Sequence, residues 1–300
     1  MFTTIAILIL ALLGVIYSAD KLVDGSTNIA RRFNISEFVI GALIVGVGTS
    51  LPELVVSAIG AIQNNSDIAI GNVVGSNIFN ILGILGLTSI IFPISIKTEN
   101  IKFDIPVCLI VSIIVILMMP VINFIDGIVL LICFILFTIL SLKNTNTVQV
   151  ICSNENILMS VLKVIFGLFL LIICCDIFVD KSIIIAKQFG LSDAVISLTI
   201  LACGTSMPEF ASSLVAAFKK NTQLALGNII GSNIFNITFI LGVCSQITDL
   251  TTSNIGLVDY SMMLFAVIAL IVCSLFKKIN KFAGVIMLAS FIAYTIYLIN

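Results

Sequence analysis

Long stretches of apolar residues follow one another along almost the whole chain, and short polar connections separate them. A helix of about 20 apolar residues is long enough to span the hydrocarbon core of a bilayer. The pattern therefore predicts an all-α polytopic membrane protein with ten transmembrane helices. The predicted helices cover residues 2–20, 38–63, 68–92, 103–120, 122–142, 157–179, 194–218, 223–247, 257–276 and 281–299.

The two halves of the chain are related by an internal duplication. Residues 20–86 align without a gap to residues 176–242, and about 32 of the 67 positions are identical. Halves of five helices each must enter the membrane in opposite senses, and such inverted repeats place the substrate site near the midplane between them. We therefore expect a first repeat at 1–142 (core about 38–92), a linker at 143–155 and a second repeat at 156–300 (core about 194–247).

The basic residues indicate how this arrangement is oriented. With ten helices, twelve of the fourteen lysines and arginines fall on one side of the membrane, and only Lys181 and Lys187 fall on the other. Cytoplasmic connections carry the excess of basic residues. We expect a cell-membrane protein with a cytoplasmic 143–155 linker and both termini outside. Because the segment Asp20–Asp24 has a counterpart in Asp176–Asp180, we expect residues 2–20 to form a retained helix rather than a cleaved signal peptide.

Composition excludes several kinds of chemistry. Charged residues make up 10% of the chain, and there is no histidine, which is the commonest transition-metal ligand and proton shuttle. The eight cysteines lack metal-binding spacing, and no nucleotide-binding loop or basic patch for nucleic acid is present. We expect no enzyme activity, no cofactor, no nucleic-acid partner and no obligatory protein partner.

A polar motif interrupts the second predicted helix and recurs in the seventh. It reads GTSLPE at residues 48–53 and GTSMPE at residues 204–209. Pro52 lacks an N–H group, so we expect the helix to break across residues 48–51 and to restart near Pro52. Freed carbonyls, hydroxyls and a carboxylate form an all-oxygen set, which suits Na⁺ or Ca²⁺. Glu53 and Glu209 at membrane depth would need a cation or a shared proton between them.

A second motif recurs at the same offset, with GNVVGSNIFN at residues 71–80 and GNIIGSNIFN at residues 227–236. Its glycines favour close helix packing. Packing does not explain its polar residues, and we expect ion ligation by Ser76, Asn80, Ser232 and Asn236. Asn77 and Asn233 fit either ligation or a hydrogen bond between helices.

At these residues the chain resembles the cation/calcium exchanger superfamily, and specifically its prokaryotic sodium/calcium exchanger branch. Both motifs, each present twice, carry the resemblance over nearly the full length. It implies ten helices in two inverted repeats, broken helices 2, 3, 7 and 8 around a midplane site, and alternating access by sliding of the first and sixth helices. The implied ligands of Ca²⁺ and Na⁺ are Glu53, Asn80, Glu209 and Asn236, with oxygens from Thr49, Ser50, Ser76, Thr205, Ser206 and Ser232.

One position departs from part of that family. Some members carry Asp where this chain has Asn236, so the site here holds at most two formal negative charges. One Ca²⁺ or two Na⁺ would balance them, which leaves the coupling ion (Na⁺, H⁺ or K⁺) and the stoichiometry open. A cation channel would need a continuous pore, usually from oligomeric symmetry, and two buried glutamates oppose an anion transporter. The sequence therefore favours a Ca²⁺/Na⁺ antiporter.

Overall fold

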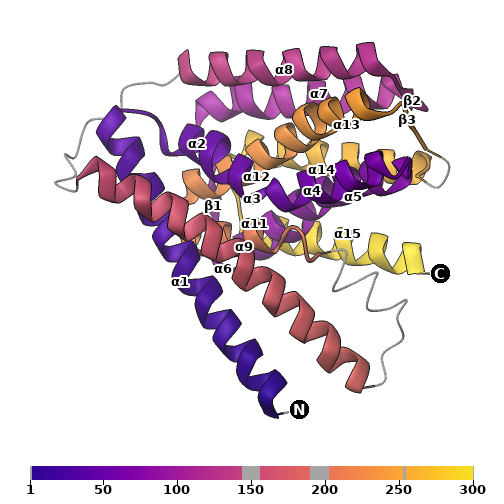
Figure 1. Ribbon diagram of the computed structural model, residues 1–300. Helices are drawn as coiled ribbons and strands as arrows, with labels where there is room; N and C mark the ends of the chain where they lie inside the picture. Colours follow the sequence, from indigo (N-terminus) through magenta and orange to yellow (C-terminus); the bar gives the residue numbers. More distant parts are fainter. Residues whose placement is uncertain (1, 144–155, 190–202, 253–254, 300) are drawn as a thin grey trace.

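The protein is described here by a computed structural model, which covers residues 2–143, 156–189, 203–252 and 255–299 (Figure 1). Almost all of it is helical, and π-helical segments are labelled η. The elements are α1 (Phe2–Phe33), α2 (Glu37–Ile40), η1 (Gly41–Gly46), α3 (Val47–Thr49), α4 (Leu51–Ile62), α5 (Ser66–Ile78), η2 (Phe79–Leu85), α6 (Gly86–Ile91), β1 (Ile94–Ser95), η3 (Asn100–Asp104), α7 (Ile105–Met118), β2 (Val121–Ile122), α8 (Phe124–Lys143), α9 (Ile157–Gln188), α11 (Met207–Phe218), α12 (Thr222–Phe235), η5 (Asn236–Ile240), α13 (Leu241–Ile247), β3 (Leu250–Thr251), α14 (Leu257–Leu275), β4 (Lys278–Ile279) and α15 (Lys281–Ile299).

Within the described residues, eight helices are long and apolar enough to cross a membrane, and a bent pair of shorter helices makes a ninth. The bent pair is Glu37–Thr49 with Leu51–Ile62, which meet at an angle of 47°. The remaining predicted helix, 194–218, lies partly outside the described residues, and its described part is α11. The structure is thus an all-helical polytopic membrane fold.

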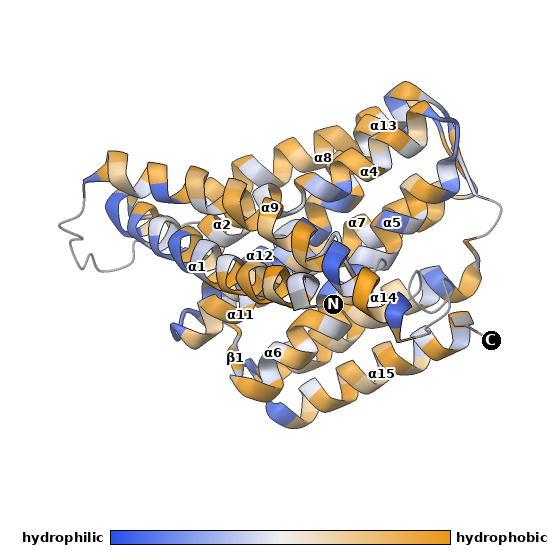
Figure 2. Cartoon of the chain, turned by 60° about the horizontal axis from the view of Figure 1, so that its bottom comes forward, coloured by the Kyte–Doolittle hydropathy of each residue, from blue (hydrophilic) through white to orange (hydrophobic). Residues whose placement is uncertain are grey.

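The polarity of the fold is that of a membrane protein. Large apolar side chains such as Leu117 and Ile125 are 77% and 71% exposed, whereas Glu53 and Glu209 are fully buried. Figure 2 shows apolar residues along most of the length of the helices. Of an 18-residue apolar stretch within Thr222–Ile247, 94% is buried, whereas only 17% of Lys281–Leu298 is buried. The helices that carry the second polar motif therefore lie at the centre, and α15 lies at the periphery.

The first and sixth predicted helices are longer than their apolar stretches indicated. We expected residues 2–20 and 157–179, but α1 extends to Phe33 and α9 to Gln188. The apolar stretch ends at the first charged residue. The helix continues beyond it, because polar side chains there can face partners or solvent. Asp20 and Asp24 therefore lie within α1 rather than at its end.

Helices α1 and α9 form an antiparallel pair that runs along one side of the molecule (Figure 1). Glycines allow their backbones to approach closely. A methyl group at Gly25 would lie 2.6 Å from the carbonyl oxygen of Ser160, and one at Gly167 would lie 2.7 Å from the amide nitrogen of Leu22. Small residues have this role at contacts between transmembrane helices, where backbones pack directly.

The third and eighth predicted helices are not broken, contrary to our expectation. Each is one continuous run, Ser66–Ile91 and Thr222–Ile247, with a π-helical segment inside it. Neither run contains a proline, and glycine alone does not force a break. Asn80 and Asn236 lie in the first turn of these π segments, η2 and η5. Such local widenings of a helix are frequent at functional sites.

Candidate cation site between the two repeated motifs

The two copies of the first motif have the same backbone geometry. Ser50 has φ −85° and ψ 9°, Ser206 has φ −86° and ψ 9°, and a new helix begins at the next residue in each case. The expected break at residues 48–51 is therefore confirmed in the first copy. Proline occupies the second position of each new helix, where a missing N–H costs nothing. Each glutamate follows directly after its proline, in the first turn.

The two copies are joined by a crossed pair of hydrogen bonds. The Ser50 hydroxyl donates to Oε1 of Glu209 at 2.8 Å, and the Ser206 hydroxyl donates to Oε1 of Glu53 at 2.9 Å. Both serines and both glutamates are fully buried. Hydrogen bonds to charged groups are stronger than neutral ones. The structure thus brings four of the predicted site residues together across the interface between the halves.

Two asparagines that we had not assigned support each break from the neighbouring helix. The Asn72 amide donates to the carbonyl oxygen of Glu53 at 3.1 Å, and the Asn228 amide donates to that of Glu209 at 3.1 Å. Their amide oxygens lie at hydrogen-bonding distance from the hydroxyls of the opposite motif, at 3.5 Å for Thr205 and 3.2 Å for Thr49. Both asparagines belong to the duplicated second motif. Their recurrence at the same offset was the feature of the sequence that could have marked them as functional.

The asparagines further along α5 and α12 bind one another. Asn77 and Asn233 exchange side-chain bonds to each other's backbone carbonyl, at 3.2 and 3.1 Å. The Asn80 amide donates to Oδ1 of Asn233 at 3.0 Å, and the Asn236 amide donates to Oδ1 of Asn77 at 3.1 Å. Asn77 and Asn233 are therefore helix–helix links. These bonds also fix the orientation of Asn80 and Asn236, because their N–H groups are used and their oxygens are left over.

Four buried oxygen atoms in this region accept no hydrogen bond from the described residues. They are Oε2 of Glu53, Oε2 of Glu209, Oδ1 of Asn80 and Oδ1 of Asn236. All four side chains are fully buried. An unpaired buried acceptor costs about 1–3 kcal/mol, and a charged one costs more. Carboxylate and amide oxygens are ligands that Ca²⁺ and Na⁺ prefer, so the set matches a cation better than a neutral solute.

The other predicted site residues have mixed surroundings. Thr49 is buried and its hydroxyl also donates to the carbonyl of Val45 at 2.9 Å, whereas Thr205 is half-buried. The Ser232 hydroxyl donates to the carbonyl of Gly46 at 3.1 Å. Ser76 lines a large cavity together with Thr205. The threonines and Ser232 thus stabilise irregular backbone beside the four unpaired oxygens.

A cavity of about 930 Å³ lies next to this region, between α4, α5 and α9. Its lining is mostly apolar, with Ser76, Asn72 and Thr205 from the two motifs. Asp176 and Asp180 of α9 also line it. The cavity therefore borders motif residues from both halves, and Asp176 and Asp180 place carboxylates along its wall.

Comparison with known proteins places this geometry in a family. The profile of the sodium/calcium exchanger protein family matches residues 3–143 and 159–300. A membrane protein of Methanocaldococcus jannaschii is 37% identical over 289 residues, covering 95% of this chain and 94% of its own. The sodium/calcium exchanger MaX1 of Methanosarcina acetivorans is 29% identical over 340 residues, covering 97% of both chains.

Solved structures agree with the sequence comparison. A structure of the sodium-calcium exchanger NCX_Mj superposes with a TM-score of 0.88 at 36% sequence identity, and the match covers 98% of both chains. A profile match over nearly the whole chain and a structural match of this extent lead to the same assignment. The chain belongs to the sodium/calcium exchanger protein family.

Proposed function

We propose that this protein is a secondary antiporter that exchanges Ca²⁺ for Na⁺ across the cell membrane by alternating access. The proposal rests on one observation, a set of four buried oxygens without a partner among the described residues, two from each half. They belong to Glu53, Asn80, Glu209 and Asn236. They are oxygen ligands of hard cations, they are fully buried, and the ions that would bind them are the transported substrates. Membership of an exchanger family supports transport rather than enzyme catalysis.

The proposed ligand set has an inner and an outer part. Glu53, Glu209, Asn80 and Asn236 supply the inner oxygens. Further hydroxyl or carbonyl oxygens come from Thr49, Ser50, Ser76, Thr205, Ser206 and Ser232. Ser50 and Ser206 support this arrangement because each binds the glutamate of the opposite half, at 2.8 and 2.9 Å.

The proposed architecture has ten transmembrane helices in two inverted repeats, residues 1–142 and 156–300. The 143–155 linker is cytoplasmic and both termini are outside, because this orientation puts most lysines and arginines in the cytoplasm. The crossed bonds between the motifs support the repeat, since each contact has a counterpart at the same offset in the other half. An inverted repeat places the site at the midplane, where either side can reach it in turn.

The charge of the site constrains the coupling. Glu53 and Glu209 supply two formal negative charges, and Asn80 and Asn236 supply none. One Ca²⁺ or two Na⁺ neutralises this set. Coupling to H⁺ or K⁺ is the alternative within the same mechanism, because protons on the two glutamates would also remove the charge. A channel is less compatible with glutamates that are fully buried between the two halves.

The test is ⁴⁵Ca²⁺ uptake into proteoliposomes that contain the purified protein. Vesicles are loaded with Na⁺, with K⁺ or with acid, and diluted into medium without that gradient ion. We expect uptake only when Na⁺ can leave the vesicle. We also expect external unlabelled Ca²⁺ to release accumulated ⁴⁵Ca²⁺, because an exchanger carries out Ca²⁺–Ca²⁺ counterflow. Uptake driven by the proton gradient alone would show that H⁺, rather than Na⁺, is the coupling ion. Passive equilibration without counterflow would indicate a channel.

A further inference from the structure

Two short β-ribbons connect the halves of the molecule, one made of β1 and β4 and the other of β2 and β3. Each ribbon pairs a strand of the first half with a strand of the second. Ile94 pairs with Ile279 in one and Ile122 with Leu250 in the other, and all four side chains are fully buried. Helix α14 crosses the membrane between β3 and β4, so the two ribbons lie at opposite faces (Figure 1). Their backbones and buried contacts are therefore equivalent.

The two ribbons differ in charge. The β1–β4 ribbon with its flanks, residues 91–98 and 275–282, contains four lysines and no acidic residue. These are Lys97, Lys277, Lys278 and Lys281. The β2–β3 ribbon with its flanks, residues 119–126 and 247–259, contains three aspartates and no lysine or arginine. Glu99 follows directly after the first ribbon and leaves it with a surplus of positive charge. The two halves have thus kept the fold of the ribbons and reversed their charge.

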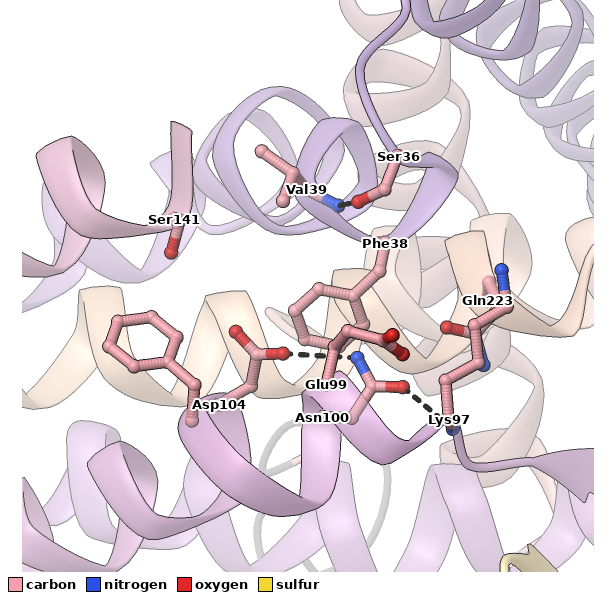
Figure 3. A pocket seen from close by; sticks show the side chains of 10 residues that line it. Ser36, Phe38, Val39, Lys97, Glu99, Asn100, Asp104, Ser141 and Gln223 are labelled. Carbon is pink, nitrogen blue, oxygen red and sulfur yellow. Dashed lines mark hydrogen bonds between the residues drawn. The ribbon is translucent and has the colours of Figure 1, made fainter. Parts of the chain in front are cut away.

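The pairing of the strands brings the lysines together. The carbonyl of Lys277 accepts a bond from the N–H of Ile96 at 2.9 Å, so that Lys277 and Lys278 lie beside the first strand. The segment after β1 is also fixed, because Oδ1 of Asn100 accepts a bond from the N–H of Lys97 at 3.0 Å (Figure 3). All four lysines are exposed, and none forms an ion pair with a described residue. Their charges are therefore available to a partner outside the chain.

Two lysines in this region have an unfavourable backbone conformation. Lys277 has φ 55° and Lys220 has φ 60°, in the left-handed region that favours glycine and asparagine. Asn64 occupies the position equivalent to Lys220 in the first half, with φ 54°, so the turn itself does not need a lysine. Lys220 belongs to the same surface, because Oγ1 of Thr222 lies 2.7 Å from Oγ of Ser95 in β1. Positive charge is thus present here at a cost to the backbone.

Large apolar side chains flank these lysines. Leu275, Phe276 and Phe282 are 73%, 69% and 74% exposed, and they stand directly before and after the segment 277–281. Lysines beside exposed aromatic and aliphatic side chains are typical of the membrane interface, where the apolar groups enter the acyl chains and the ammonium groups reach the headgroups. The surface therefore fits a charged bilayer better than a free anion or an acidic protein in solution.

We propose that the β1–β4 ribbon is a binding surface for the headgroups of anionic phospholipids. Lys97, Lys277, Lys278 and Lys281 supply its charge, with Lys220 beside them. Basic residues next to a membrane-spanning helix attract anionic lipids. Because β1 belongs to the first half and β4 to the second, lipids bound to both strands hold the two halves together at this face. The β2–β3 ribbon, with its aspartates, does not bind these lipids.

The test measures thermal unfolding of the full-length chain in neutral detergent micelles that contain phosphatidylglycerol or phosphatidylcholine with the same acyl chains. We expect the midpoint to rise with phosphatidylglycerol and to saturate, because a ligand of the folded state stabilises it, and to respond less to phosphatidylcholine. Lys277→Gln/Lys278→Gln should raise the half-saturating phosphatidylglycerol content about tenfold or more, since each lysine near an anionic surface contributes a factor of about five. High salt should weaken the response of the unaltered chain.

Arg32→Gln/Lys143→Gln is the matched control. It also removes two exposed basic residues, but from the ends of α1 and α8 rather than from the ribbon. The control should keep the half-saturating phosphatidylglycerol content of the unaltered chain. The proposal is overturned if the lysine variant responds like the unaltered chain, or if the control loses its response to the same degree. Inorganic phosphate should not raise the midpoint, and a rise equal to that with phosphatidylglycerol would identify a site for free phosphate instead.

A second measurement compares the two ribbons without any substitution. Hydrogen exchange of the unaltered chain is followed in nanodiscs of phosphatidylcholine with and without phosphatidylglycerol. The anionic lipid should slow exchange in residues 93–98 and 276–282 and leave residues 119–126 and 247–252 unchanged. Equal slowing in both ribbons, or none in the β1–β4 ribbon, would contradict the proposal. Neither experiment depends on transport, so failure of this proposal leaves the proposed exchange function unaffected.

Discussion

The two halves of the chain make matching contacts at the centre of the molecule. The serine-to-glutamate bonds that cross between the halves measure 2.8 and 2.9 Å, and the two serines have nearly identical backbone angles. Asn72 and Asn228 each support the backbone of the glutamate next to them at 3.1 Å. Where the proposed ion binds, both halves supply the same groups, and these serine and asparagine bonds have closely matching lengths.

The halves differ where the long helices α1 and α9 meet the rest of the fold. Lys219, which follows α11, bonds to Asp20 and Asp24 of α1 at 2.6 Å each. The matching position after α4 is Gln63, and Asp176 and Asp180 of α9 line the large cavity instead. The two halves have thus kept the same chemistry at the centre. At the edges, where α1 and α9 meet the rest of the fold, the two halves hold these long helices differently.

The largest effect should come from removing either central carboxylate. Glu53→Gln and Glu209→Gln should each reduce Na⁺-driven ⁴⁵Ca²⁺ uptake about 100-fold, because a lost charged ligand costs about 1.5–3 kcal/mol. The two variants should be equally impaired, since the carboxylates occupy equivalent positions. Glutamine keeps the shape and can still accept a bond from Ser50 or Ser206, so size-exclusion profiles should stay unchanged. Normal uptake by either well-folded variant would refute the site.

A second experiment adds a negative charge to the second half of the central site and leaves the first half unchanged. Asn236→Asp introduces a third carboxyl group beside Glu53 and Glu209, and it removes the amide that donates to Asn77 at 3.1 Å. We expect the charge moved per cycle or the affinity for Ca²⁺ to change, the latter about tenfold, as the net charge of the site changes. Combined flux and current measurements give both quantities. Asn80→Asp is the matched control in the other half, and unchanged values in both variants would show that these positions do not set the charge balance.

The supporting asparagines should differ in importance. The two hydrogens of the Asn228 amide are shared by the carbonyl of Glu209 and the hydroxyls of Ser212 and Ser213, at 2.9 and 2.8 Å for the hydroxyls. Among the described residues, the Asn72 amide has one hydroxyl partner, Ser57 at 3.0 Å, besides the carbonyl of Glu53, and Asn72 lines the large cavity. Asn228 is also fully buried. Asn228→Ala should therefore lower the free energy of unfolding by about 1 kcal/mol more than Asn72→Ala, because water in the cavity can replace the Asn72 amide, whereas the partners of Asn228 are left buried and unpaired. Denaturation in detergent measures this difference, and equal losses would contradict it.

Much of the centre could be predicted from the sequence, because its signals are local. Pro52 lacks a backbone N–H and favours a helix break, and the duplication marks Glu53, Asn80 and their counterparts as a set. Asn72 and Asn228 carried the same signal but were not assigned, since their role depends on which backbone atom lies opposite each amide. That information is tertiary.

The edges could not be predicted in the same way. Hydropathy placed the end of the first helix at Asp20, but α1 continues to Phe33 because a helix needs hydrogen-bonded backbone rather than apolar side chains. Besides its neighbour Lys21, Asp20 pairs with Lys219, almost two hundred positions away, and nothing local in the sequence indicates that second pair. The predicted ligand roles of Ser76 and Ser232 remain predictions, although Ser232 donates to the carbonyl of Gly46.

The smallest expected effect concerns the lysine that distinguishes the two edges. Lys219→Gln removes the link between α11 and α1 and should lower the free energy of unfolding by less than about 1 kcal/mol, because all three side chains are partly exposed to solvent. The loss should shrink at high salt, which screens such pairs. Burial alone would lower the pKa of Lys219, but its hydrogen bonds to Asp20 and Asp24 raise it above the usual lysine value. The part of the stabilisation that depends on the charge of Lys219 is therefore complete at neutral pH and is lost as pH rises through that raised pKa.

Gln63→Lys is the matched change at the other edge, and it shows whether the asymmetry belongs to the fold or only to the sequence. If the cavity keeps α9 apart from α4, the new lysine has no carboxylate to bind and stability should not change. Hydrogen exchange would then show faster exchange in α1 after Lys219→Gln and no slowing in α9 after Gln63→Lys. A stabilisation by Gln63→Lys equal to the loss from Lys219→Gln would mean that Asp176 and Asp180 can be reached from α4, and that a single residue, rather than the arrangement of the helices, makes the two edges differ.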